Sequence, residues 1–358
     1  MTDTASKTDY IVATDAAPIA VDVVADIGNA RTVVLVRRDG EDVPMALTMP
    51  SVRSLHGAFS WELFAARGLA PQSWGKLERD EHVIERDGVE RFVGRLAVEH
   101  IAAASSGRGS DARYHDGTTL DFILAGIAAA LPGASKITAR LTTMLPVSLW
   151  HLAPKAVDAL RGKHTYTYNG REMAVTIASV AVKREGEAAF ASLDGDTSGP
   201  VVVIDGGGRT VNIALFRDGQ YRDGRTLELG VQAALDNLDK ALIGRTLRTL
   251  TLGERGELES ALINGQPYSI IVAGVAHAIT PLARAQLDET ARALVQEVYR
   301  CVPLDMARRV VFVGGAAHAA LFGATVKAQI PRCELTGLRE LANAYGAMGA
   351  APKRGRKK

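Results

Sequence analysis

Two short stretches of the chain combine a carboxylate with glycine in a way that suits phosphate binding. In one of them, Asp205 follows the aliphatic run 201–204 and precedes Gly206, Gly207 and Gly208. Glycine has no β-carbon, so the backbone N–H groups beside it can come close to a bound anion. A carboxylate at the same place can hold a divalent cation, which offsets its repulsion of the phosphates. The stretch is therefore a candidate site for a magnesium nucleotide.

A second copy of this pattern lies near the start of the chain. The spacing from Asp26 to Gly28 equals that from Asp205 to Gly207, and an Asp-Gly turn follows each copy at the same distance. Either copy alone could be an ordinary hairpin, because Asp-Gly turns are common. Together they indicate two related halves of the molecule that face each other.

The residues after the second glycine cluster predict a strand. Val211, Ile213 and Leu215 alternate with Asn212 and Ala214, which is the period of a strand. A dinucleotide-binding loop would have to open a helix, so that interpretation does not hold. The chain also lacks the Gly-x-x-x-x-Gly-Lys-Ser/Thr signature of P-loop enzymes. Each unit is therefore predicted to be a hairpin with an acidic glycine turn.

The composition is that of a globular protein of about two domains. Of the 358 residues 47% are hydrophobic and 23% charged, and the net charge of +2 is too small to indicate a nucleic-acid partner for the body of the protein. No apolar run approaches membrane-spanning length and no signal peptide is evident, so we expect a cytoplasmic protein without a membrane partner. The two cysteines and scattered histidines indicate neither a disulfide scaffold nor a metal site made of protein ligands alone.

Helical and strand patterns alternate along the chain, which predicts an α/β fold with two sheets. Thr118 and Asp121 are placed as a capping box for one of the helices. The predicted helices are 95–104, 120–131, 154–160, 230–243 and 281–302, and the predicted strands include 137–145, the hairpin 165–168 with 173–182, and 309–313.

The predicted domains follow from these elements. We expect a flexible tail at 1–17, a first domain at 18–190 to which 335–350 returns, a second domain at 191–334 and a basic tail at 351–358. Prolines and glycines with weak periodicity suggest a small subdomain inserted in the first domain at about 44–110.

The motifs together resemble the actin, chaperone and sugar-kinase ATPase superfamily. Asp26-x-Gly, Asp205-Gly-Gly-Gly-x-Thr and Val313-Gly-Gly-Ala carry this resemblance. Leu145-Pro-Val, the stretch 180–186 and Asn343-Ala-Tyr-Gly are similar to the plasmid-segregating bacterial actins of the ParM type. The resemblance extends from about residue 21 to 349. It implies an actin-like fold, with two related α/β domains around a nucleotide cleft.

The resemblance also implies a function. An ATPase of this kind binds ATP with Mg²⁺ and polymerises with itself into dynamic filaments, which serve plasmid or other DNA segregation through a DNA-bound adaptor protein. The basic residues of 353–358 either keep the tail solvated or make a weak DNA contact.

Individual residues match the family's site. Asp26 and Asp205 match the carboxylates that act through Mg²⁺, directly or through water. Glu185 matches the residue that orients the attacking water, although the neighbouring Glu187 could take this role instead. Gly314, Gly315, Ala316 and Asn343 match contacts on the nucleoside side, although the two glycines could equally serve packing alone. The phosphate side would be formed by Gly28, Asn29, Ala30, Arg31, Gly206, Gly207, Gly208, Arg209 and Thr210.

Two positions depart from the family pattern. Val33 occupies a position where many relatives have lysine, so Arg31 would have to supply the positive charge. Asn212 replaces a common aspartate, and we expect it to affect packing more than chemistry. The alternative function is a small-molecule kinase of the same superfamily, but no motif for a sugar pocket is found. A chaperone-type ATPase is disfavoured because the chain ends soon after Asn343-Ala-Tyr-Gly.

Overall fold

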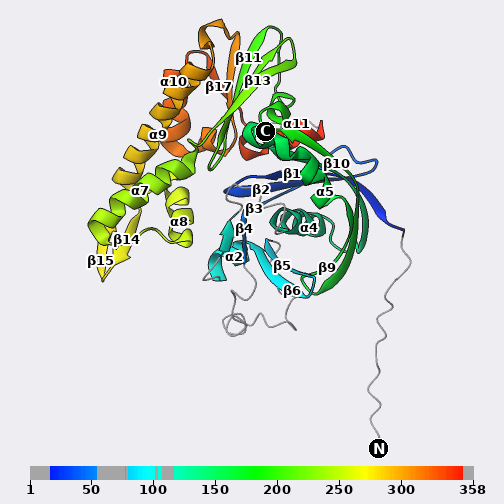
Figure 1. Cartoon of the computed structure of the whole chain (residues 1–358). Coiled ribbons are helices and arrows are strands. Elements are labelled where there is room, and N and C mark those ends of the chain that lie inside the picture. Colours follow the sequence, from blue (N-terminus) through cyan, green and yellow to red (C-terminus); the bar gives the residue numbers. More distant parts are fainter. Residues whose placement is uncertain (1–16, 55–76, 78–79, 101–103, 107–116, 350–358) are drawn as a thin grey trace, which may run out of the picture.

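The computed structural model describes residues 17–54, 77, 80–100, 104–106 and 117–349. Within them the strands form two large sheets and one small hairpin, with helices packed against them (Figure 1). Strands and helices alternate, which confirms the predicted α/β class. No helix in this part of the chain is long and apolar enough to cross a membrane.

The first sheet has ten strands in the order β3-β2-β1-β8-β10-β9-β5-β6-β4-β7. At its centre β1, β8 and β10 run parallel, while β2 and β9 pair with them antiparallel as hairpins. The strands are β1 (Ile19–Ile27), β2 (Arg31–Arg38), β3 (Met45–Pro50), β4 (Val52–Ser54), β5 (Glu81–Arg86), β6 (Val89–Gly94), β7 (Ala104–Ser106), β8 (Lys136–Leu145), β9 (Gly162–Tyr168) and β10 (Arg171–Arg184). The described strands of the predicted insertion at 44–110 belong to this sheet, with β3 at one edge and β4 to β7 towards the other.

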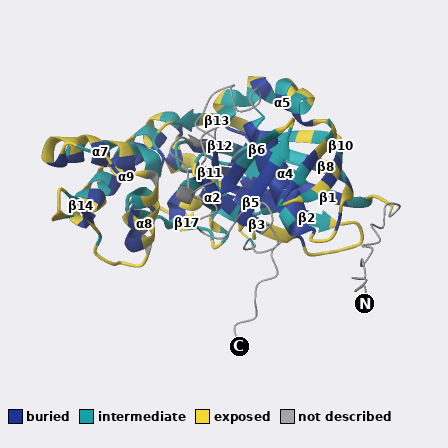
Figure 2. Cartoon of the chain, turned by 90° about the horizontal axis from the view of Figure 1, so that it is seen from below, coloured by how far each residue is buried: buried dark blue, intermediate teal, exposed yellow. Residues whose placement is uncertain are grey.

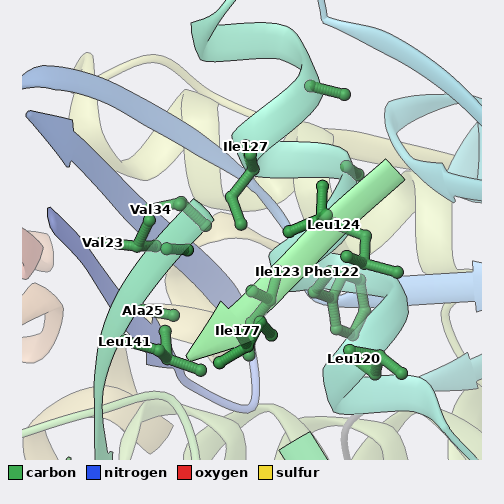
Figure 3. Packing of buried hydrophobic residues seen from close by; sticks show 14 of the residues in the cluster. Val23, Ala25, Val34, Leu120, Phe122, Ile123, Leu124, Ile127, Leu141 and Ile177 are labelled. Atoms are coloured by element: carbon green, nitrogen blue, oxygen red, sulfur yellow. The ribbon is translucent and has the colours of Figure 1, made fainter. Parts of the chain in front are cut away.

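The first sheet curves around helix α4 (Thr118–Ala130), of which every residue except Ala129 is buried (Figure 1). Its aliphatic side chains meet those of β1, β2, β8 and β10, including Val34 and Ile177 (Figure 3). A helix that is apolar on all sides is expected at such an enclosed position. Helices α2 (Arg95–His100) and α5 (Ala153–Leu160) and the 3₁₀ helix η2 (Val147–Leu152) complete this half. Figure 2 shows the buried residues concentrated along α4 and the strands around it.

The second sheet has five strands in the order β13-β12-β11-β16-β17, and β11 and β16 run parallel at its centre. The strands are β11 (Pro200–Gly206), β12 (Val211–Arg217), β13 (Gln220–Leu227), β16 (Arg309–Val313) and β17 (Cys333–Leu335). The helices of this half are α7 (Val231–Thr246), α8 (Leu252–Ile263), α9 (Thr280–Cys301) and α10 (Ala320–Gln329), with 3₁₀ helices η3 (Leu304–Met306) and η4 (Gly315–His318). Strands β14 (Ser269–Val272) and β15 (Val275–Ala278) form the small hairpin at the end of this half that lies away from the five-stranded sheet (Figure 1).

Short helices connect the two halves. Helix α6 (Glu187–Phe190) follows β10, and the 3₁₀ helix η5 (Arg339–Leu341) leads into α11 (Ala342–Met348). Ala344 and Met348 of α11 pack in an apolar cluster with Val24 and Leu35 of the first sheet. The end of the described chain therefore lies on the half of the molecule where it began. The tails 1–16 and 351–358 lie outside the described residues.

Two local predictions were wrong. The helix expected at 95–104 ends at His100, and Ala104 begins β7. The capping box of Thr118 and Asp121 does not form, because α4 is preceded by Gly117 in a left-handed conformation with φ of 73°. The buried Asp121 carboxylate instead accepts a hydrogen bond from Arg53 Nη1 at 2.7 Å and another from Arg86 Nε at 3.0 Å.

Candidate functional site

A cavity of about 390 Å³ lies between the two sheets and is lined from both of them. It receives the turns of the β1–β2 and β11–β12 hairpins, the start of α7, the segment after β16 and the start of α11. The predicted site residues that line it are Asp26, Gly28, Asn29, Ala30, Arg31, Glu185, Asp205, Gly206, Gly207, Gly208, Thr210, Gly314, Gly315, Ala316 and Asn343. The structure thus brings together residues from widely separated parts of the sequence.

The two hairpin turns contain the same backbone hydrogen bond. The N–H of Gly28 donates to the carbonyl of Arg31 at 3.0 Å, and the N–H of Gly207 donates to that of Thr210 at 2.9 Å. The repeat read from the sequence is therefore also a repeat of structure.

The two turns touch each other inside the cavity. A β-carbon built on Gly208 would lie 2.8 Å from Ala30 Cβ, which is closer than such atoms approach in proteins. Gly314 is just as restricted, since its φ is 85° and a β-carbon there would lie 2.4 Å from the carbonyl oxygen of Gly206. These glycines let the backbones that line the cavity approach one another.

Asp205 is the more buried of the two predicted cation ligands, with only 5% of its surface exposed. Burial raises its pKa to about 6, and the hydrogen bond that Asn343 Nδ2 donates to its Oδ2 at 2.7 Å opposes this rise. Asn343 Oδ1 in turn accepts from the backbone N–H groups of Gly186 and Ala189, at 3.2 and 3.1 Å. Asn343 therefore holds Asp205 and the start of α6 together while it lines the cavity.

Asp26 occupies the equivalent position at the end of β1 and is partly exposed. Among the described residues no group of three or more His, Cys, Asp or Glu could hold a metal ion. Two carboxylates that face one cavity can still hold a cation whose other ligands are water and phosphate oxygens, as is usual for Mg²⁺. The donor set of Asp26 and Asp205 fits that arrangement.

Glu185 directly follows β10 and lies on the wall of the cavity. Its N–H donates to the carbonyl of Leu145 at 2.8 Å, and its Oε2 accepts from Asn212 Nδ2 at 2.5 Å. Glu187 is directed differently: its carboxylate accepts from Arg184 Nη1 at 3.3 Å, and it is not among the residues that line the cavity. Of the two glutamates left open by the sequence, the geometry favours Glu185.

Val33, at the position where many relatives have lysine, and the nearby Arg31 differ in burial and charge. Val33 is 2% exposed and packs with Val24 and Met144 in an apolar cluster. It also forms part of the cavity wall. Arg31 is exposed and lines the same cavity. A guanidinium is therefore available at the cavity wall from position 31, whereas position 33 supplies an aliphatic side chain.

One predicted residue lies elsewhere. Arg209 lines a smaller cavity of about 140 Å³ beside the first, where it forms an ion pair with Glu228 at 3.5 Å. The Arg209 side chain is therefore directed away from the main cavity, although its neighbours Gly208 and Thr210 line that cavity.

Sequence reasoning missed other residues of the wall. They come from the first turns of α7, from α8, from the end of η4 and the residue after it, and from η5: Val231, Gln232, Leu235, Glu259, His318, Ala319, Arg339 and Glu340. Helix 230–243 was expected, but nothing in its pattern indicates that its first turn faces the glycine turn. The structure supplies the reason, because the N–H of Gln232 donates to the carbonyl of Gly208 at 2.6 Å.

Known structures share this architecture over nearly the whole chain. The archaeal actin homologue Ta0583 in complex with ADP has a TM-score of 0.70 and 18% identity, covering 92% of this chain and 98% of that one. The actin-like protein Alp7A has a TM-score of 0.65 and 17% identity, with coverages of 93% and 96%. ParM of Bacillus thuringiensis with ATP has a TM-score of 0.65 and 13% identity, with coverages of 92% and 97%.

Comparison by sequence gives a narrower match. No curated protein matches the chain. Residues 25–187 match the family described as the N-terminal domain of actin-like proteins. The chain therefore carries a domain of this family at residues 25–187, and its described part has the actin-like fold.

Proposed function

We propose that the protein is an ATPase that binds Mg-ATP in the cavity between its two sheets and polymerises with it into filaments. The observation that carries the proposal is the meeting of two equivalent hairpin turns, each with an aspartate, across one cavity. Similar proteins support it, since their structures include one with ATP, one with ADP and a ParM variant described as non-polymerisable.

The residues that line the cavity would have different roles in ATP binding and hydrolysis. Backbone N–H groups of 28–31 and 206–210 would hold the phosphates, and 314–316 would lie on the nucleoside side. Asp26 and Asp205 would hold Mg²⁺ through water, and the bound cation would neutralise phosphate charge. Glu185 would accept a hydrogen bond from the attacking water and orient it.

Exposed aliphatic side chains support self-association. Ile243 and Leu247 near the end of α7, together with Ile271 and Val275 of the β14–β15 hairpin, are between 46% and 91% exposed. The end of α7 lies beside this hairpin, since Arg248 Nη2 donates to the carbonyl of Ile271 at 3.1 Å (Figure 1). Apolar groups concentrated at one end of a molecule commonly mark a contact with another protein.

The first expected result is cooperative polymerisation. Light scattering should rise above a critical protein concentration when Mg-ATP is added, and fall again as the ATP is consumed. Head-to-tail contacts that do not close produce an open helical filament, which electron microscopy would show. Ile271→Asp should raise the critical concentration without changing the affinity for Mg-ATP, because Ile271 is 69% exposed and is not among the residues that line the cavity. A protein that stays monomeric with ATP, yet phosphorylates a small hydroxyl compound, would instead support the kinase alternative.

A second expected result concerns the contact between the turns. Gly208→Ala should lower the affinity for Mg-ATP, by about tenfold or more, because the added methyl group collides with Ala30 and forces the turns apart. Gly244→Ala is the control: Gly244 lies in α7 outside the cavity lining, and a β-carbon there meets no atom within 4 Å. Isothermal titration with a non-hydrolysable ATP analogue measures both variants. Equal affinities in the two variants would contradict the proposed position of the phosphates.

The cargo is a further part of the proposal. Segregation of a plasmid or other DNA, through an adaptor bound to the DNA, is the role that the family resemblance favours. Co-sedimentation of the filaments with DNA, with and without the tail 353–358, would test a direct contact and distinguish it from a tail that only aids solvation.

A further inference from the structure

The side chain of Asn212 lies at the junction of the two sheets and makes a contact on each of its polar atoms. It is 1% exposed and pairs with Asp205 across the β11–β12 hairpin. Its Oδ1 accepts from the backbone N–H of Val147 at 3.2 Å and from Thr226 Oγ1 at 2.7 Å. Its Nδ2 donates to Glu185 Oε2 at 2.5 Å.

These contacts fix which way the amide faces. Two hydrogen-bond donors, from Val147 and Thr226, converge on one of its polar atoms, so that atom must be the oxygen. The amide nitrogen is then left facing Glu185 and can donate to an ionised carboxylate. An aspartate at position 212 could accept from the same two donors, but it would place a second negative charge against Glu185.

The network connects the two halves of the molecule. Val147, Ser148 and Glu185 belong to the half built on the ten-stranded sheet, whereas Asn212 and Thr226 belong to the five-stranded sheet. The N–H of Ser148 donates to Thr226 Oγ1 at 3.0 Å, which leaves the hydroxyl free to donate to Asn212. The backbone of Glu185 is thus held by the first half, and its carboxylate by the second.

The residue before Glu185 bridges the halves in the same place. The guanidinium of Arg184 lies 4.0 Å from the ring centre of Trp150 and 4.9 Å from that of Tyr221. Trp150 belongs to η2 of the first half and Tyr221 to β13 of the second. A cation held between two aromatic rings restricts the main chain at position 184 and so supports the placement of Glu185.

We infer that Asn212 is a positioning residue, which directs the carboxylate of Glu185 and makes that direction depend on the contact between the two sheets. The inference rests on the proposed role of Glu185 in ATP hydrolysis. A shift of one sheet relative to the other would move the amide away from the carboxylate, so turnover would respond to the shape of the subunit.

Steady-state kinetics test this role. Asn212→Asp and Asn212→Leu should each lower kcat about 10- to 100-fold, the range for losing a hydrogen bond to a charged group, while KM for Mg-ATP stays within about threefold of the wild type. Thr226→Val removes one of the two donors to Oδ1 and should cause a smaller loss. Unchanged kcat in both Asn212 variants, or a rise in KM as large as the fall in kcat, would overturn the inference.

A double-mutant cycle tests the contact without relying on catalysis. Asn212→Asp should lower the urea midpoint of unfolding, because two carboxylates then face each other in a partly buried place. Adding Glu185→Gln should restore much of the loss, because the glutamine amide can donate to the new carboxylate. Additive effects of the two substitutions would overturn the inference. If the wild type does not hydrolyse ATP, the proposed function fails, and this cycle still decides whether Asn212 holds Glu185.

Discussion

Replacing Glu185 with glutamine is expected to remove most ATP turnover and leave ATP binding intact. The glutamine carbonyl can still accept from Asn212 Nδ2, as Glu185 Oε2 does at 2.5 Å, so the wall of the cavity should keep its shape. The amide cannot take a proton from water, and loss of a general base typically costs 10²- to 10⁴-fold in rate. Phosphate release should therefore fall by about that factor, while the affinity for Mg-ATP stays near that of the wild type.

Filaments provide an independent measure of the same change. Because the subunits of Glu185→Gln would remain in the ATP state, filaments that form with Mg-ATP should persist after the wild-type filaments have disassembled. Glu187→Gln is the matched control. Glu187 is two residues away and paired with Arg184 outside the cavity wall, so its substitution should leave turnover largely unchanged. The reverse result, with turnover lost only in Glu187→Gln, would move the catalytic role to that residue.

The paired hairpins could be predicted from the sequence because their signals are local. The aliphatic run 201–204 predicts β11, the alternation at 211–215 predicts β12, and the Asp-Gly spacing predicts equivalent turns at Gly28 and Gly207, as the structure shows. The buried helix α4 was also expected, because its apolar residues follow helical spacing. Such patterns depend on a few neighbouring residues, which a single sequence displays.

Contacts between distant residues could not be predicted in the same way. Asn212 was expected to matter for packing, yet its amide contacts Glu185, which is 27 positions earlier in the chain. Similarly, Thr118 and Asp121 have the spacing of a capping box, but Asp121 is drawn into ion pairs with Arg53 and Arg86. In both cases a tertiary partner with a stronger interaction decides what the side chain does.

The domain boundaries stay predictions, although several features fit them. Helix α11 packs on the first sheet, as a returning segment would. The short hairpin β14–β15 and helix α8 had no clear periodic signal in the sequence and were not predicted. Their position beside α7 depends on a core of distant aliphatic residues such as Leu258, Ile270 and Leu242.

Replacing Asp205 with asparagine is expected to abolish Mg-ATP binding and, at neutral pH, to stabilise the protein without nucleotide. The carboxylate is buried, and its folded-state pKa of about 6 lies above the ordinary 3.8. Between these two values the folded state holds the proton more tightly than the unfolded state. The free energy of unfolding of the wild type should therefore fall as the pH rises from about 4 to about 6, and level off above that.

In Asp205→Asn the carboxyl group that titrates between pH 4 and pH 6 is absent. An asparagine at 205 can still accept from Asn343 Nδ2 through its own carbonyl oxygen, so the hydrogen bond now 2.7 Å long is retained. The variant should therefore be more stable than the wild type by up to about 3 kcal/mol above pH 6, the equivalent of roughly two pKa units, and the difference should shrink towards pH 4. Urea unfolding in a series of buffers from pH 4.5 to pH 8 measures it.

With Mg-ATP present, we expect the wild type to become more stable than Asp205→Asn. Mg-ATP should raise the midpoint of unfolding of the wild type in proportion to the logarithm of its concentration, and should leave Asp205→Asn unchanged, because a ligand stabilises only a fold that binds it. A variant that is less stable than the wild type at pH 8 would contradict the raised pKa of the buried Asp205 carboxyl. A variant that still gains stability from Mg-ATP would show that the cation is held without this carboxylate, and the magnesium site would then have to be built around Asp26 alone.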